Sequence, residues 1–338
     1  MDAFKAYMWV SIVALLAESA VALNIETVRV GDPGNAGQWS GESYGGYGPN
    51  RICGAVDYIY NIGKYEVTAG QYTEFLNAVA ATDTYGLYNP EMWSNSLGCR
   101  IQRSGSAGHY TYSVAPEWAN RPVNYVSWGD AVRFANWLHN GQPIGVQGPL
   151  TTEDGAYYLN GATSNADLIK ISRQADWKWA VTSEDEWYKA AYYKGGSADA
   201  EYWDYPTGSN LSPGQDIHDL SGNNANYYTD NGVYPLDAPY YTTITGAFEN
   251  SAGPYGTYDQ GGNVWEWNEA VIIGLKRGIR GGSFYNYEVG LHESSRNSYF
   301  PASEIFNVGF RVSQIPEPGS VLLVMIGCLG LIRRSYRY

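Results

Sequence analysis

The sequence predicts an α+β fold that is loop-rich, with short strands and few helices. The chain of 338 residues holds 40 glycines, 31 tyrosines and 12 tryptophans, but only 16% of its residues are charged. Helices are usually filled with Ala, Leu, Glu and Lys, whereas aromatic residues separated by glycine turns favour short strands and irregular loops. Three helix-start signals occur along the chain, and the absence of a 20–50-residue repeat argues against a solenoid or a propeller.

The first 22 residues are predicted to be a secretory signal peptide. Lys5 precedes an apolar run over residues 7–16, and Ala20, Val21 and Ala22 complete an Ala-x-Ala cleavage site. The run is shorter than the ~20 residues of a membrane-spanning helix. We therefore expect cleavage after Ala22 and export of the protein.

A strand-to-helix transition opens the domain proper. Residues 28–30 and 59–67 are predicted strands. Thr68 and Gln71 form a capping box that begins the first helix. The apolar stripe of this helix consists of Tyr72, Phe75, Leu76 and Val79. Residues 82–120 then predict an aromatic, polar loop.

Two further helices are predicted from their caps. Ser127 ends a predicted strand over residues 121–127 and begins a helix that stops at Gly141. Residues 142–177 read as an insertion with room for a hairpin. Ser183, with Glu186 at the capping-box position, begins a third helix that runs to Gly195.

The stretch from residue 258 to 267 organises the rest of the chain. Glycines 261 and 262 suit a tight turn that enters a strand whose aromatic residues alternate between two faces. Asp259 and Glu266 bring two carboxylates beside a turn that exposes backbone carbonyls, and Ca²⁺ prefers such hard oxygen ligands. A second Gly-Gly turn follows at residues 281–282, and residues 309–312 predict a strand that closes the sheet.

Charge and cysteine content limit the kinds of function. The net charge is −13, from 21 basic and 34 acidic residues, which argues against nucleic-acid binding and is compatible with cation binding. Cys53 and Cys99 would meet an oxidising compartment after export, so we expect a disulfide between them, the alternative being two free buried thiols. No Cys/His spacing predicts a zinc site.

Five segments in order resemble the formylglycine-generating, or sulfatase-modifying factor, family. They lie at residues 63–75, 121–131, 182–187, 258–267 and 280–284, and residues 309–312 extend the match. The resemblance implies a C-type-lectin-like fold, and we expect residues 23–314 to form one domain of this kind.

The resemblance also implies two calcium sites. In the first, Asp259 and Glu266 supply side-chain oxygens, and Gly262 and Val264 supply carbonyls. The alternative is that Glu266 pairs with an arginine such as Arg280 and no ion is bound.

The second implied calcium site lies upstream of the first. Its ligands by resemblance are Asn226, Tyr227, Asp237 and Pro239, although the segment between the Asn and the Asp is shortened. The alternative is an ordinary Asn/Asp-rich turn.

The catalytic positions of the family are changed in this chain. In the family, two cysteines five residues apart bind copper and oxidise a substrate cysteine; by resemblance these positions hold Asn286 and Leu291. An amide and an isobutyl group cannot bind copper(I) or form a mixed disulfide, so we expect neither copper nor the signature activity. His292, Glu293 and Arg296 lie beside these positions as groove candidates, although a structural histidine and a buried, carboxylate-paired arginine are the simpler interpretation.

The C-terminus resembles a PEP-CTERM sorting tail of Gram-negative bacteria. Pro316, Glu317 and Pro318 precede an apolar run over residues 321–332 and then Arg333 and Arg334. The resemblance implies that an exosortase removes residues 315–338, a short transmembrane anchor, and that the protein reaches the cell surface or the exopolysaccharide matrix. The alternative is a plain C-terminal anchor.

Together these features predict an exported, calcium-stabilised protein that binds a glycan or a surface protein, or has a structural role in the matrix, without copper-dependent oxidation. Aromatic faces and amides are the groups on which sugars stack and to which they hydrogen-bond. The alternative is an oxidoreductase or another enzyme that uses the same groove with different residues.

Overall fold

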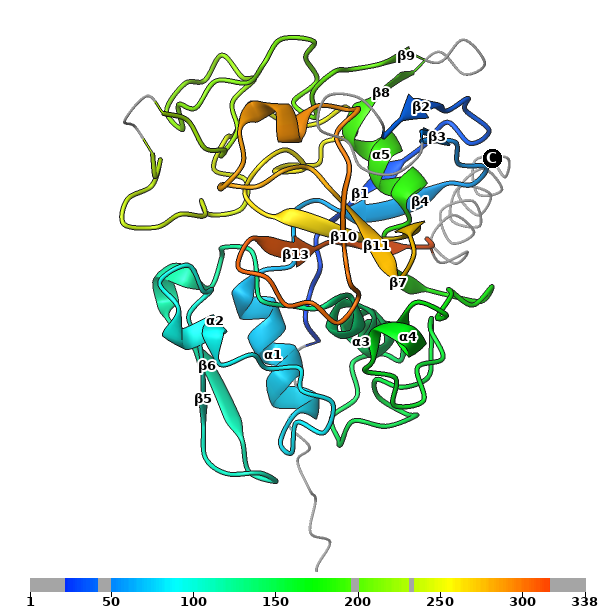
Figure 1. Ribbon diagram of the computed structural model, residues 1–338, viewed down its shortest axis with the longest axis vertical. Helices are drawn as coiled ribbons and strands as arrows, with labels where there is room; N and C mark the ends of the chain where they lie inside the picture. Colours follow the sequence, from blue (N-terminus) through cyan, green and yellow to red (C-terminus); the bar gives the residue numbers. More distant parts are fainter. Residues whose placement is uncertain (1–21, 42–49, 196–200, 231–233, 317–338) are drawn as a thin grey trace, which may run out of the picture.

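The computed structural model describes residues 22–41, 50–195, 201–230 and 234–316. Two four-stranded sheets lie at the centre, with α1 and α3 on one side of them and α5 on the other (Figure 1). The first sheet has the order β1-β4-β14-β7 and is antiparallel throughout. Its strands are β1 (Thr27–Val30), β4 (Tyr60–Gly63), β14 (Val312–Gln314) and β7 (Trp179–Val181).

The second sheet carries the stretch that organises the sequence. Its order is β12-β11-β10-β13, and only the β10–β13 pair is parallel. Its strands are β12 (Asn297–Tyr299), β11 (Lys276–Arg280), β10 (Trp265–Ile273) and β13 (Val308–Phe310). The predicted strand at residues 309–312 therefore divides at Arg311, where the chain leaves the second sheet and enters the first as β14.

The three predicted helix starts are confirmed. Helices α1 (Ala69–Val79), α3 (Trp128–His139) and α5 (Glu184–Tyr192) each begin with a complete capping box. Their N-caps are Thr68, Ser127 and Ser183. Helix α5 ends earlier than predicted, because β8 (Tyr193–Gly195) begins directly after it and pairs with β9 (Glu201–Tyr202).

Two other predictions for local structure are wrong. Residues 121–127 form no strand; Pro122 makes only an isolated bridge to Thr68, and Tyr125 has a positive φ of 57° that breaks an extended run. The predicted loop at residues 82–120 contains short elements. These are α2 (Glu91–Ser94), the hairpin β5 (Ile101–Ser104) and β6 (Thr111–Val114), and a 3-10 turn (Pro116–Trp118).

The remaining short elements complete the periphery. They are the hairpin β2 (Gln38–Ser40) and β3 (Arg51–Cys53), α4 (Asn165–Leu168) and a 3-10 turn (Glu288–Leu291). The sequence left room for a hairpin in residues 142–177. These residues instead contain α4 and one isolated bridge, between Tyr157 and Arg173.

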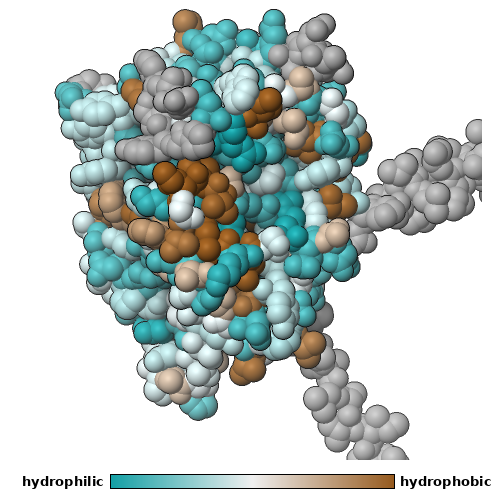
Figure 2. Space-filling view, turned by 45° about the vertical axis from the view of Figure 1, so that its right-hand side comes forward, coloured by the Kyte–Doolittle hydropathy of each residue, from teal (hydrophilic) through white to brown (hydrophobic). Residues whose placement is uncertain are grey.

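The main core lies between α1, α3 and both central sheets. It includes stacked and edge-to-face aromatic rings from Tyr72, Phe75, Phe134, Trp137 and Phe310. Hydrophobic residues also gather on the molecular surface, as Figure 2 shows for one face. Among the residues that the structure describes, no helix has the length and apolarity needed to cross a bilayer. The predicted signal peptide up to residue 21 and the tail from residue 317 lie outside those residues.

Candidate functional site

The turn that enters β10 has the tight geometry that its glycines predict. Asp259, Gly262 and Asn263 all have positive φ values, of 59°, 88° and 55°. Asn263 donates its backbone N–H to the Asn226 carbonyl at 2.8 Å, and a Cβ at position 262 would lie 2.2 Å from that same oxygen. Only glycine allows this close approach of two backbones. The two segments with predicted calcium ligands are therefore neighbours.

Glu266 has two protein partners. Its carboxylate accepts hydrogen bonds from Arg311 Nε at 2.6 Å, Arg311 Nη2 at 2.7 Å and Trp187 Nε1 at 2.7 Å, and both charged side chains are fully buried. The arginine that pairs with Glu266 is thus Arg311; Arg280 instead binds Glu184 at 2.8 Å. This bidentate pair neutralises Glu266 and orients it.

A carboxylate that the sequence analysis missed lies beside this pair. Glu66, three residues beyond β4, is 1% exposed, and neither of its carboxylate oxygens has a hydrogen-bond partner among the described residues. Burial raises the pKa of Glu66 well above its ordinary value, and the nearby carboxylates of Asp259 and Glu266 raise it further. An unpartnered buried carboxylate is costly.

The pKa of Asp259 is also raised, although less than that of Glu66. Burial raises the pKa of its carboxyl to about 6, and its carboxylate accepts a hydrogen bond from the Gly246 backbone N–H at 2.6 Å. The one local signal for Glu66 in the sequence is its position between Tyr65 and Val67 inside the predicted strand over residues 59–67.

These residues fit a calcium ion by their chemistry. Glu66 offers two carboxylate oxygens without partners among the described residues, and Asp259 offers a carboxylate that the Gly246 N–H contacts at one oxygen. The backbone carbonyls of Gly262 and Val264 are ligands by resemblance. In the part of the chain that the structure describes, no three His, Cys, Asp or Glu side chains lie close enough together to bind a metal by themselves. A calcium ion here would therefore depend on the carboxylates of Glu66 and Asp259, supplemented by backbone carbonyls. The predicted ligand Glu266 already binds Arg311 through both of its oxygens.

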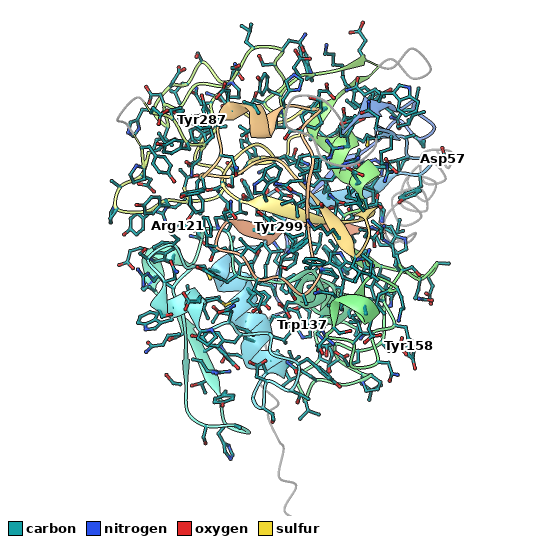
Figure 3. All side chains as sticks on the ribbon, viewed as in Figure 1. Asp57, Arg121, Trp137, Tyr158, Tyr287 and Tyr299 are labelled. Atoms are coloured by element: carbon teal, nitrogen blue, oxygen red, sulfur yellow. The ribbon has the colours of Figure 1, made fainter. Side chains whose placement is uncertain are left out.

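At the second predicted calcium site, an arginine side chain already binds the carboxylate of Asp237. Asp237 binds Arg121 Nη2 at 2.6 Å, and Arg121 also donates to the carbonyl of Thr242 and stacks 3.9 Å from the Tyr240 ring centroid. Arg121 lies at the side of the molecule in Figure 3. The Asn226 side-chain oxygen is buried without a hydrogen-bond partner among the described residues. Tyr227 and Pro239 neighbour these groups in the chain, and Pro239 follows a cis peptide bond.

The positions of the family cysteines hold structural side chains. The Asn286 Oδ1 accepts hydrogen bonds from Ser283 Oγ at 2.5 Å and Trp265 Nε1 at 2.8 Å. Leu291 is fully buried and packs with Tyr205, Ala225 and Tyr227. Neither side chain offers the soft, exchangeable ligand that copper(I) needs.

The three groove candidates are engaged in different ways. His292 Nδ1 lies 2.9 Å from Ser294 Oγ, and its ring packs edge-on against Tyr205. Glu293 accepts hydrogen bonds from Tyr188 at 2.6 Å and Gln38 at 3.1 Å. Arg296 is 1% exposed and lies 3.5 Å from the Glu184 carboxylate, the buried arrangement that the simpler interpretation describes.

The predicted disulfide is wrong. Cys53 and Cys99 are both free and buried, and they belong to different clusters of the core. Cys53 lies 3.4 Å from an Arg280 nitrogen, whereas Cys99 faces the Asn124 carbonyl. Burial raises the pKa of Cys53 to about 12 and that of Cys99 to about 11, so both remain protonated thiols.

An aromatic surface surrounds Asn286. We use this name for Tyr228, Asp230, Tyr285, Tyr287 and Phe306. Tyr285 and Tyr287 are 57% and 49% exposed. Tyr228 packs against Tyr287 with ring centroids 5.1 Å apart, and both hydroxyls donate to the Asp230 carboxylate, at 2.7 and 2.8 Å. Tyr285 packs edge-on against Phe306. The alternating Tyr285 and Tyr287 of the sequence were the available signal for this surface.

The fold and the glycine turns together define a sulfatase-modifying-factor domain. The chain matches the family described as sulfatase-modifying factor enzyme 1-like domain over residues 55–314, and it belongs to this family. No curated protein matches the sequence.

Solved structures agree on the fold. Treponema denticola variable protein 1 is 20% identical, with a TM-score of 0.53 over 88% of this chain and 99% of that one. CarF is also 20% identical, with a TM-score of 0.50 over 87% of this chain and 100% of that one. The predicted loop-rich, C-type-lectin-like α+β fold is thus confirmed.

Proposed function

We propose that this protein is a calcium-stabilised member of the family that binds a ligand and does not carry out copper-dependent cysteine oxidation. The observation that carries the proposal is the replacement of both cysteines: the Asn286 amide is fixed by Ser283 and Trp265, and Leu291 is buried. Without a thiolate, the site can neither hold copper(I) nor form a mixed disulfide with a substrate.

The calcium part of the proposal is supported by the buried acidic groups. Among the described residues, neither carboxylate oxygen of Glu66 has a hydrogen-bond partner, and burial also raises the pKa of the neighbouring Asp259 carboxyl. A divalent cation would offset both charges, and Ca²⁺ is the common cation that takes carboxylate and carbonyl oxygens in an irregular arrangement. Copper and iron remain poor candidates because the described residues present no thiolate or imidazole cluster.

The proposed ligand is a glycan, and the aromatic surface is its proposed site. Sugars stack their apolar faces on aromatic rings and exchange hydrogen bonds with nearby carboxylates and amides. Tyr285 and Tyr287 present exposed rings, and Asp230 lies between two tyrosine hydroxyls. The surface surrounds the position that the family uses for chemistry, so a loss of catalysis leaves a ready recognition site.

Export and surface delivery complete the proposal. Residues 1–22 would direct secretion, and residues 315–338 would hold the protein in the membrane until an exosortase releases it. A matrix of exopolysaccharide would then place a glycan ligand beside the aromatic surface. A direct check is mass spectrometry of the mature protein, which should begin at Leu23 and lack the tail.

The binding test compares two tyrosines of equal exposure. Tyr285 and Tyr158 are each 57% exposed, and Tyr158 lies at the end of the molecule opposite Tyr287 in Figure 3. We expect retention of the native protein on immobilised cellulose, dextran or alginate. Tyr285→Ala should weaken that retention roughly tenfold, as for loss of one stacked ring, and Tyr158→Ala should leave it unchanged. Equal behaviour of the two variants, or no retention on any polysaccharide, would argue against the proposed site.

Metal analysis separates this proposal from an enzyme. We expect about one or two calcium ions per chain after purification in calcium-containing buffer, and no oxidation of a cysteine peptide. Stoichiometric copper or iron, or turnover of the peptide, would favour the alternative in which His292, Glu293 or Arg296 takes part in chemistry.

A further inference from the structure

One cavity of the molecule is lined by residues that belong neither to the aromatic surface nor to the candidate calcium ligands. It has a volume of about 310 Å³ and lies between the start of α3, the segment after α4 and the β10–β11 hairpin. Its lining includes Trp128, Ile169, Ile171, Glu269, Val271 and Arg277. This volume is at the lower end of the range for small-molecule sites.

Arg277 is a buried cation without a carboxylate partner. It is 2% exposed, and its two terminal nitrogens donate only to backbone carbonyls, those of residues 168, 169, 171 and 269. Among the described residues, its Nε has no hydrogen-bond partner and no carboxylate forms an ion pair with it. By contrast, Arg133, Arg280 and Arg311 are equally buried and each binds a glutamate.

Trp128 adds a second unused donor next to the first. The Arg277 guanidinium carbon lies 3.5 Å from the centroid of the Trp128 ring, which is fully buried. The Trp128 Nε1 has no hydrogen-bond partner among the described residues. The indole nitrogens of Trp187 and Trp267, which are as deeply buried, both donate hydrogen bonds. Buried polar groups of a native protein are almost always satisfied, so two unsatisfied donors in the wall of one cavity require an explanation. Both nitrogens are covered in this structure, so a ligand in the cavity reaches them only after the lining side chains shift.

The rest of the cavity lining consists of one carboxylate and several aliphatic side chains, among others. Glu269 is the only carboxylate in the lining of this cavity, and it binds Arg173 Nε at 2.9 Å and the Tyr157 hydroxyl, so its charge is already compensated. Ile169, Ile171 and Val271 contribute aliphatic surface, and Val271 is 53% exposed at the mouth of the cavity.

We propose that this cavity binds a small aliphatic carboxylate, whose oxygens accept hydrogen bonds from Arg277 Nε and Trp128 Nε1 and whose apolar body packs on Ile169, Ile171 and Val271. Both unused groups are donors, so the ligand must provide acceptors. An anionic acceptor is preferred over a neutral one because hydrogen bonds to a charged partner are about twice as strong and Arg277 has no direct counter-charge.

The test uses hexanoate with the purified protein labelled with ¹⁵N at its tryptophan indoles. Titration should move the Trp128 indole signal, which is identified by its loss in Trp128→Phe, and should saturate at millimolar or lower concentration. Hexylamine, with the opposite charge, and hexan-1-ol, without charge, should cause at least tenfold weaker binding. Equal binding of hexanoate and hexan-1-ol, or an unmoved Trp128 signal, would overturn the proposal.

Two exposed positions on the same strand provide a variant and its control. Val271, which pairs with Arg277 across the hairpin, lines the cavity; Ile273, two residues on and 60% exposed, does not. Val271→Asp places a negative charge at the mouth of the cavity and should weaken hexanoate binding tenfold or more, whereas Ile273→Asp should change it less than twofold. Because both sites are at the surface, both variants should fold. Equal affinities of the two variants would contradict the proposal.

Discussion

Two groups of buried carboxylates near β10 differ in how their charge is balanced. Glu184 is surrounded by Arg51, Arg280 and Arg296, at 3.1, 2.8 and 3.5 Å. Although burial alone would raise it, these arginines hold the pKa of Glu184 below its ordinary value. Glu66 is equally buried and Asp259 is half-buried, and in this group burial together with neighbouring carboxylates raises both pKa values. Arginine side chains thus neutralise Glu184, where several segments meet. Among the described residues, Glu66 and Asp259 have no such partner, and this is the place where we expect a calcium ion to bind.

The largest expected effect is the loss of an internal cation. Arg311→Ala leaves Glu266 buried without its partner, and we expect the free energy of unfolding to fall by about 3–5 kcal/mol in urea denaturation. Lys64→Ala is the control, since Lys64 pairs with the exposed Glu26 and such pairs contribute about 0–1 kcal/mol. Similar losses in the two variants would mean that the buried pair contributes no more than a surface pair.

Removal of the proposed calcium ion should have the next largest effect on stability. Chelation should lower the Tm of the native protein by about 5 °C or more, as expected when a ligand at high saturation is lost from a domain of this size. Glu66→Gln should show almost no response to chelator and should melt above the chelated native protein, because it no longer buries an uncompensated charge. Glu74→Gln, at an exposed position of α1, should respond like the native protein. A full response in Glu66→Gln would exclude Glu66 as a ligand.

Glu304 and Asp130 form a further pair of carboxyl groups, and in this pair a shared proton takes the place of a cation. Burial raises the pKa of Glu304 to about 8 and that of Asp130 to about 6, and Asp130 raises that of Glu304 further through charge and a hydrogen bond. Between about pH 4.5 and 8 the folded state therefore keeps a proton that the unfolded state has released. The free energy of unfolding should consequently fall as the pH rises through this window. With calcium present, Glu304→Gln should flatten most of this slope in urea melts; an unchanged slope would assign the effect to other groups.

The smallest effect is expected from reduction. Cys53 and Cys99 are free and lie in different clusters, so dithiothreitol should leave the Tm unchanged. A thiol reagent should modify both residues only after unfolding, since burial keeps them protonated. A drop in Tm on reduction would indicate a disulfide after all.

The local features of the fold were readable in the sequence. A capping box involves only four consecutive residues, so the starts of α1, α3 and α5 could be predicted from Thr68, Ser127 and Ser183 alone. The turn at Gly262 was predictable for a similar reason, since glycine there allows a positive φ. The strand predicted over residues 121–127 failed because Pro122 and the positive φ of Tyr125 prevent a regular ladder.

The candidate sites were less predictable because they depend on distant partners. Glu66 is a candidate ligand because it lies near Asp259, which is almost two hundred positions later in the chain. No neighbouring residue in the sequence indicates that Glu66 is unpaired. Asp237 is a candidate calcium ligand by resemblance, but Arg121 binds it from a separate segment. The unused donors of Trp128 and Arg277 likewise become visible only when α3 and β11 meet.

The passage of the chain from β13 to β14 has a mechanical consequence. β14 is the last described strand and is hydrogen-bonded to β4 on one side and β7 on the other. A pulling force on the chain beyond residue 316 would act along this strand, in shear, so that bonds on both of its edges bear the load together. Before that load reached β13, it would also have to withdraw the Arg311 side chain from Glu266, Gly63 and Tyr258. Extraction of the last described strand therefore requires the loss of two ladders and of the buried Arg311 contacts at the same time.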